Sequence, residues 1–295
     1  MQTLSLTAPR HSAASLAQRL PPEVFFVTSA LFHYTGPAFA VLLFSRVDPL
    51  GMAWLRIASA ALIFAVWQRP WRLFRQIGAA DRRGVIALGL VLAAMNSTFY
   101  LALARLPLST VGAIEFLAPI GLAAFGLRSA RNAGALLLAV LGVYLLTDIR
   151  IERAALGYVY AFANCMLFAL YIVFGHRMAA DGGAVHGIHR LGVAMLVAAV
   201  AAFPVGIREA VPALRHPALL AAAIGVGVCS SVIPYVLDQF AMARLTRASF
   251  ALMLTLLPAT ATGVGILVLG QIPAPVELIG IGLVIAGVAL HRRLP

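Results

Sequence analysis

The sequence contains little charge, no lysine and almost no cysteine. Charged residues make up 11% of the 295 positions, whereas about 25% is usual for a soluble domain. Hydrophobic residues make up 62%, and the mean hydropathy is +0.96. So many apolar side chains need lipid or one another as neighbours, which excludes a soluble fold of this length.

Several chemical classes lack their usual signatures. The two cysteines, Cys165 and Cys229, lie in separate apolar runs, so neither a structural disulfide nor a metal site is expected from them. Residues 1–22 lack the apolar core of a secretory signal, and we expect them to form a retained cytoplasmic tail. No HExxH motif, nucleophile elbow or phosphate-binding glycine loop occurs. The sequence therefore predicts no catalytic residue, no metal and no cofactor.

Ten apolar runs are long enough to cross a bilayer as helices. They predict an all-α integral membrane protein with ten transmembrane helices. Several prolines, such as Pro217 and Pro275, open these runs, where proline is well tolerated. The runs cover residues 23–45, 49–68, 84–104, 108–127, 132–147, 155–175, 187–206, 217–241, 247–269 and 275–291.

The arginines predict the orientation. All 22 basic residues are arginine, and most lie in the short gaps between runs. Arg56 lies inside the second run, fifteen others fall on the side of both termini, and six fall on the opposite side: Arg46, Arg105, Arg150, Arg153, Arg208 and Arg215. Cytoplasmic loops are enriched in arginine, so both termini should be cytoplasmic. This distribution also explains the net charge of +12 without nucleic acid.

An internal repeat relates the two halves of the chain. Arg105 and Arg244 are 139 residues apart, and so are Pro119 and Pro258, each in the middle of the following run. Chance echoes in a sequence of few residue types are the alternative explanation. The shared offset of arginine and proline favours a true repeat.

The repeat divides the chain into residues 23–147 and 155–291. Each half contains five runs, an odd number, so the halves should enter the membrane from opposite sides. Such inverted repeats are typical of secondary transporters, which bind substrate near the membrane midplane. Pro119 and Pro258 are then candidate hinges, although static kinks are an equal alternative.

A family resemblance rests on motifs spread over residues 24–291. They are Trp54-Leu55-Arg56, Pro70-Trp71-Arg72, Met95-Asn96 with Phe99-Tyr100, Arg105-Leu106-Pro107, Glu115-Phe116 with Pro119, and Pro234-Tyr235 followed by Ala243-Arg244-Leu245. With these motifs the chain resembles the EamA branch of the drug/metabolite transporter superfamily, in particular threonine/homoserine and YddG-type amino-acid exporters. The chain departs from the family pattern at Leu257-Pro258 and Gly270-Gln271, where such exporters often carry acidic residues.

The resemblance implies an inner-membrane exporter of amino acids or related metabolites that works by alternating access. Its expected partners are a small-molecule substrate and the lipid bilayer, without nucleic acid, and a monomer is the expected form. An importer of nucleotide sugars or other metabolites with the same fold is one alternative. An intramembrane enzyme is another, but it would need a cluster of acids or histidines at one membrane interface, which the sequence lacks.

Glu115 and Arg56 are the candidate charged groups of a substrate site. Each lies about seven residues into a run that starts from the outer side, so both are at a similar depth and can meet. A charge at that depth is costly unless it faces a cavity or a partner. Glu115 could bind a proton or a substrate ammonium, and Arg56 a carboxylate, which together match a zwitterion. A purely structural ion pair is the alternative.

Other polar residues in the runs are further candidates for binding substrate. Asn96 and Tyr100 share one helical face, for cavity lining or for hydrogen bonding between helices. The others are His33, Tyr34, Asn164, Tyr171 and Tyr235. For His33, ordinary packing is the main alternative. Asp238, near the end of the eighth run, is expected to balance Arg244 or Arg247.

Overall fold

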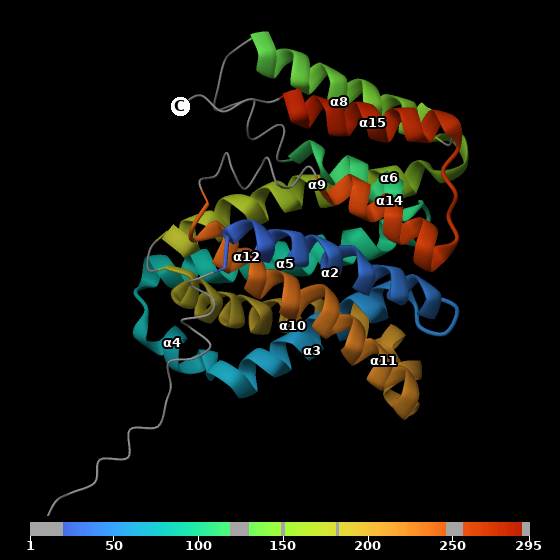
Figure 1. Ribbon diagram of the computed structural model, residues 1–295. Coiled ribbons are helices and arrows are strands. Elements are labelled where there is room, and N and C mark those ends of the chain that lie inside the picture. The colour runs from blue at the N-terminus through green and yellow to red at the C-terminus, as the bar shows by residue number, and fades with distance from the viewer. Residues whose placement is uncertain (1–19, 119–129, 149–150, 181–182, 246–255, 291–295) are drawn as a thin grey trace, which may run out of the picture.

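The computed structural model describes residues 20–118, 130–148, 151–180, 183–245 and 256–290 of the chain. All secondary structure in these ranges is helical (Figure 1), which confirms the all-α class for the described part. In chain order the helices are α2 (Pro22–Leu43), α3 (Pro49–Gln68), α4 (Pro70–Gln76), α5 (Ala79–Leu103), α6 (Leu108–Glu115), α8 (Ala130–Asp148), α9 (Ile151–Ala180), α10 (Gly183–Arg215), α11 (Pro217–Gly227), the π-helical turn η1 (Val228–Val232), α12 (Ile233–Met242), α14 (Leu256–Leu269) and α15 (Pro275–Leu290).

Six helical segments of the described part are long and apolar enough to cross a membrane. They are Val24–Leu43, Pro49–Gln68, Ala79–Leu103, Ala154–Met178, His186–Arg215 and Pro217–Met242. Ala133–Leu145, Leu257–Leu269 and Pro275–Gly287 form shorter apolar helices. Each predicted run therefore overlaps a helix. The fourth and ninth runs extend outside the described residues, and the count of ten membrane spans stays a prediction.

Prolines set several helix starts, as the sequence predicted. Pro22, Pro217 and Pro275 are the first residues of α2, α11 and α15. A proline there loses nothing, because the first backbone N–H groups of a helix have no partner within it. Inside α10, by contrast, Pro204 and Pro212 do not end the helix. Both side chains are exposed, and α10 continues nine residues beyond the predicted end of the seventh run.

Helices of the two chain halves pair with each other. α3 packs along α10, α6 against α14, and α8 along α15, which lie side by side at the top of Figure 1. α5 contacts α9 and α10, and in the same way α11 and η1, which precede α12 in the eighth run, contact α2 and α3. In the predicted repeat α2 corresponds to α9, α3 to α10, and α5 to the segment from α11 to α12. If each helix is exchanged with its counterpart, the same set of contacts results.

The close approach of α8 and α15 depends on two glycines. A Cβ atom added to Gly142 would lie 2.5 Å from the carbonyl oxygen of Gly280, and one added to Gly287 would lie 2.6 Å from that of Ala135. Both distances are shorter than any side chain tolerates. Small residues allow backbones to touch in this way inside membranes, where helices associate by packing. The two glycines lie in α8 and α15, which correspond to the last run of each half of the predicted repeat.

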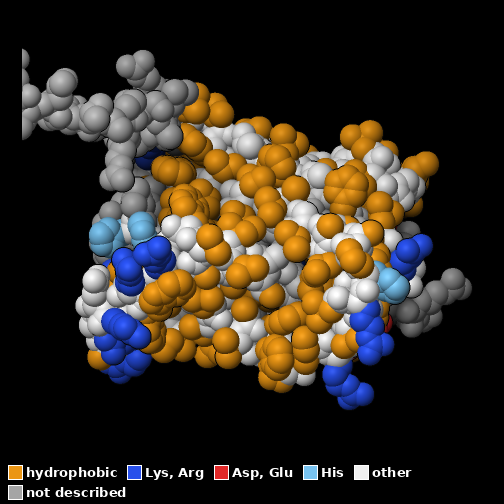
Figure 2. All heavy atoms as spheres, turned by 90° about the horizontal axis from the view of Figure 1, so that it is seen from below, with side chains coloured by type: hydrophobic (Ala, Val, Ile, Leu, Met, Phe, Trp, Pro, Cys, Tyr) orange, Lys and Arg blue, Asp and Glu red, His pale blue; other side chains and the backbone are white. Residues whose placement is uncertain are grey.

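The surface has a wide apolar belt between two charged ends. In Figure 2 hydrophobic side chains cover the middle of the visible face, and arginines gather at opposite ends. Met166 and Leu267, in apolar helices, are 70% and 86% exposed. Such exposure suits contact with lipid rather than water. In Figure 1, α2 begins and α15 ends at the end of the bundle that holds α4.

Candidate substrate-binding site

Glu115 lies at the end of α6 with side chains from two other helices around its carboxylate. It is 3% exposed. The hydroxyl of Tyr34 on α2 donates a hydrogen bond to Oε2 at 2.9 Å, and Nδ2 of Asn164 on α9 donates to Oε1 at 3.0 Å. His33 Nε2 is 3.8 Å from Oε2. Both carboxylate oxygens thus have donors, as a buried acid requires.

Arg56 on α3 is 2% exposed and is held mainly by η1. Its Nε donates a hydrogen bond to Oγ of Ser231 at 2.8 Å, and Nη2 donates to the carbonyl oxygen of Ser230 at 2.6 Å. The ring of Tyr100 on α5 covers the guanidinium, 5.6 Å from Cζ to the ring centroid. A π-helical turn shifts the backbone register, and such turns are frequent at functional sites. Here the turn presents two oxygens to a buried cation.

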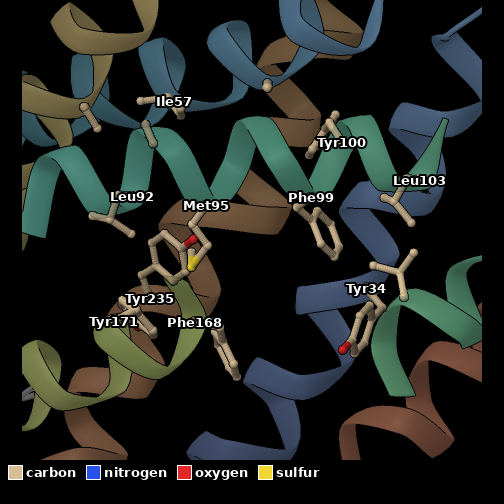
Figure 3. Packing of buried hydrophobic residues seen from close by; sticks show 14 of the residues in the cluster. Tyr34, Ile57, Leu92, Met95, Phe99, Tyr100, Leu103, Phe168, Tyr171 and Tyr235 are labelled. Atoms are coloured by element: carbon tan, nitrogen blue, oxygen red, sulfur yellow. The ribbon is translucent and has the colours of Figure 1, made fainter. Parts of the chain in front are cut away.

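Both charged groups line one small cavity. Its walls are His33, Arg56, Met95, Asn96, Phe99, Glu115, Asn164 and Tyr235. Figure 3 shows Met95 pointing from α5 toward Tyr235, with Tyr171 next to it. The cavity volume is about 10 Å³, roughly the space for one water molecule. This conformation therefore encloses the site and leaves no room for an amino acid.

The direct contact between Arg56 and Glu115 that their depth allowed is absent. No ion pair joins them in the described part of the chain, because the oxygens of η1 hold the guanidinium and Tyr34 and Asn164 hold the carboxylate. The structural ion pair considered from the sequence is thus not formed in this conformation. Each charge is buried and partnered separately, and both face the cavity.

Several buried polar atoms of the cavity wall have no hydrogen-bond partner among the described residues. They are Oδ1 of Asn96, Oδ1 of Asn164 and the hydroxyl of Tyr235. Nδ2 of Asn96, in contrast, donates within its own helix to the carbonyl oxygen of Leu92. Unsatisfied buried polar atoms are uncommon and call for an explanation. A polar ligand or water in the cavity would provide the missing partners.

The remaining predicted residues take different positions. Tyr34 and Tyr100 are fully buried and contact Glu115 and Arg56 rather than the cavity itself. Tyr171 belongs to a second, adjacent cavity. Pro258 lies in the first turn of α14, and its carbonyl accepts a hydrogen bond from Thr262. Pro119 lies outside the described residues, so the predicted hinge pair stays a prediction.

Asp238 is a buried acid beside the cavity that the sequence analysis did not include among the candidates for binding substrate. It was expected to balance Arg244 or Arg247; Arg247 lies outside the described residues, so this pairing stays a prediction. The structure shows Asp238 7% exposed and pointing into the bundle. Ser29 Oγ donates to its Oδ1 at 2.6 Å, and the hydroxyl of Tyr171 donates to Oδ2 at 3.3 Å. The sequence did contain a sign that Asp238 faces the bundle, because it lies three residues after the candidate Tyr235 and so shares its helical face.

Comparisons with known proteins agree on one family. The sequence profile of the EamA-like transporter family matches residues 155–292. The threonine/homoserine exporter RhtA of Escherichia coli K12 is 31% identical over 270 residues, which cover 90% of this chain and 89% of that protein. The same exporter of Salmonella typhimurium LT2 is 31% identical over 255 residues, covering 85% and 84%.

The chain belongs to the EamA-like transporter family. A membrane transporter and not an enzyme is therefore confirmed, and so is the resemblance to the drug/metabolite transporter superfamily. A protein of known crystal structure has the same fold, with a TM-score of 0.62 at 19% identity, covering 91% of this chain and 95% of its own.

Proposed function

We propose that this EamA-family protein is a secondary transporter that exports amino acids or closely related zwitterions across the inner membrane. One observation carries the proposal: a closed cavity faces a buried arginine on one side and a buried glutamate on the other, and the two are not paired with each other. Arg56 would bind the substrate carboxylate, and Glu115 would bind its ammonium group. The relatives named as threonine/homoserine exporters support this substrate class.

The charge balance of the cavity also weighs against the nucleotide-sugar alternative. A nucleoside diphosphate sugar carries two negative charges, and a site for it would need cations in excess. This cavity has one arginine and one carboxylate among its described walls. A zwitterion matches both groups, whereas a dianion would face Glu115 without compensation.

Alternating access is the proposed mechanism. The cavity is closed and too small for substrate, so helices must separate to load it, first from one side and then from the other. The symmetric exchange of helix contacts supports an inverted repeat of residues 23–147 and 155–291. The family match over residues 155–292 coincides with the second of these units.

The proposal is tested by counterflow in proteoliposomes. Purified protein is reconstituted with unlabelled threonine inside, and uptake of labelled threonine, homoserine and a nucleotide sugar is followed. We expect exchange of the amino acids alone. Glu115→Gln keeps shape but removes the charge, and we expect a drop of about 10-fold or more, since an ammonium loses a charged partner. Thr98→Val is the matched control, because Thr98 bonds only its own helix.

Two outcomes would count against this function. Exchange of the nucleotide sugar in preference to amino acids would replace the substrate class. If Glu115→Gln kept full activity and thermal stability, the carboxylate of Glu115 would not be part of the substrate site.

Orientation is tested separately with Ala79→Cys, which lies at the start of α5 next to the arginine-rich gap. A membrane-impermeant reagent should label it only after the membrane is permeabilised, because we propose that this gap is cytoplasmic.

A further inference from the structure

A second buried carboxylate lies beside the substrate cavity. Asp238 on α12 borders its own small cavity, which is lined by Phe26, Ser29, Ala30, His33, Phe168, Tyr171, Asp238 and Leu257. The volume of this cavity is also about 10 Å³. Asp238 accepts hydrogen bonds from two neutral hydroxyl groups, Ser29 and Tyr171, and no salt bridge reaches it within the described residues.

His33 joins the two cavities. It is 7% exposed and lines both of them. Its Nε2 is 3.8 Å from the carboxylate of Glu115, while Ser29, one helical turn earlier on α2, bonds Asp238. The order along α2 is therefore Ser29 with Asp238, then His33, then Tyr34 with Glu115. Asp238 is nearer the end of the bundle where α2 begins.

We propose that Asp238 is a second proton-binding site, which exchanges protons with Glu115 through His33 and so couples transport to the proton gradient. The inference rests on the proposed function, because Glu115 would bind either a proton or the substrate ammonium. A histidine between two carboxylates suits this role, since imidazole accepts a proton on one nitrogen and releases one from the other. Intramembrane acids and histidines arranged in chains are typical of proton relays.

The transfer conserves charge and atoms. Neutral Glu115 gives its proton to neutral His33 and becomes a carboxylate, and the imidazolium then gives a proton to the carboxylate of Asp238, which becomes neutral. The distance of 3.8 Å is too long for a hydrogen bond. One bridging water, for which each cavity has room, or a small rotation of the ring would complete the path.

Among the described residues, few other titratable groups surround this path. Those near His33 and the two acids are Tyr34 on α2, Arg56 on α3, Cys165 and Tyr171 on α9, and Tyr235 on α12. Arg56 is held by η1 and carries a fixed charge. Phenols and thiols are mainly neutral at pH 7 in water. The proposed path therefore uses Glu115, His33 and Asp238.

The test separates exchange from gradient-driven transport. In proteoliposomes, counterflow of labelled threonine needs no net proton movement, whereas accumulation driven by an imposed pH gradient does. We expect Asp238→Asn to lower gradient-driven accumulation at least about 10-fold while counterflow stays within about 2-fold of the wild type. His33→Gln also changes the wall of the substrate cavity, so it should lower both activities, accumulation more than counterflow. Glu115→Gln should lower both. Glu277→Gln is the matched control, because Glu277 is a buried acid far along the chain that bonds the backbone of Ala274.

Each result decides the proposal. If the wild type shows no counterflow, the proposed function fails. If the wild type shows normal counterflow but its accumulation of threonine does not depend on the pH gradient, only the proposed proton path is wrong. Equal loss of both activities in Asp238→Asn, with unchanged melting, would make Asp238 a substrate or structural residue instead. Should Asp238→Asn fail to fold, Tyr171→Phe and Ser29→Ala keep the carboxylate, and either must shift the pH dependence of accumulation for the proposal to stand.

Discussion

Arg56 and Glu115 line the same cavity, but different kinds of group hold them. The partners of Arg56 are a backbone carbonyl and a serine of one π-helical turn, so the cation is fixed to the chain of η1. The partners of Glu115 are side chains on α2 and α9, two separate helices. The arginine is therefore anchored to one element, and the glutamate depends on how several helices sit together. We expect helix movement to disturb the carboxylate more than the cation.

The largest effect should come from removing both charges. If Arg56 and Glu115 act on opposite ends of a zwitterion, the double variant Arg56→Ala with Glu115→Gln should transport no better than the worse single variant. A structural ion pair would behave differently, since a buried pair can often be removed together at little cost. Counterflow and thermal melting of the two singles and the double decide between these cases. Recovery of transport in the double variant would refute the separate roles.

A strong effect is expected where α2 meets η1. A Cβ atom at Gly36 would lie 2.5 Å from Cβ of Ser230, so Gly36→Ala must push η1 and the anchor of Arg56 aside. Overpacking of this kind costs about 1–3 kcal/mol. We expect lower thermal stability and weaker transport. Gly225→Ala in the neighbouring α11 is the control, because a Cβ atom there meets nothing within 4 Å. Equal behaviour of the two variants would contradict the tight contact.

A moderate loss of stability and transport should distinguish Tyr34 from Tyr100, which are equally buried. The hydroxyl of Tyr34 donates to Glu115, whereas that of Tyr100 makes no hydrogen bond in the described part of the chain and its ring alone covers Arg56. Tyr34→Phe leaves a buried carboxylate with one donor fewer, at a cost of about 1.5–3 kcal/mol. Tyr100→Phe keeps the ring. We expect melting and counterflow to fall in the first variant only, and a larger loss in Tyr100→Phe would reverse the assignment.

Hydropathy predicted where the helices lie better than it predicted their contacts. Apolar runs and opening prolines located the helices, and Arg56 and Glu115, which the sequence placed at equal depth, line one cavity in the structure. Depth alone does not give the rotation of a helix about its axis, and this rotation decides that Arg56 meets Ser231 instead of Glu115. Asp238 shows the same limit, because its closeness to the end of a run drew attention to neighbouring arginines, whereas its hydrogen bond to Ser29 also depends on the rotation of the helices.

The π-helical turn was not predictable from the sequence either. Val228–Val232 reads as an ordinary stretch of an apolar run, and α11 and α12 continue the helix on both sides. A π-helical turn is less favourable than an α-helical one, so tertiary contacts must stabilise it. The buried guanidinium of Arg56 supplies such contacts by donating hydrogen bonds to two oxygens of the turn. These contacts are long-range and have no local signature.

The smallest effect tests this anchor through two adjacent serines. Ser231 receives the Arg56 hydrogen bond on its side chain, but Ser230 receives it on its backbone carbonyl. Ser231→Ala therefore removes one hydrogen bond of the guanidinium and leaves the other, to the carbonyl oxygen of Ser230, in place, so the effect should be small. Ser230→Ala keeps its carbonyl and loses only a bond from its hydroxyl to Val226 within the same helix. We expect the apparent affinity for threonine in counterflow to weaken several-fold in Ser231→Ala and to change little in Ser230→Ala. If η1 holds the guanidinium in this way, Ser231→Ala must lose more affinity for threonine than Ser230→Ala. A greater loss in Ser230→Ala would show that the hydroxyl of Ser230, which lies next to Gly36, contributes more than the hydrogen bond from Arg56 to Ser231.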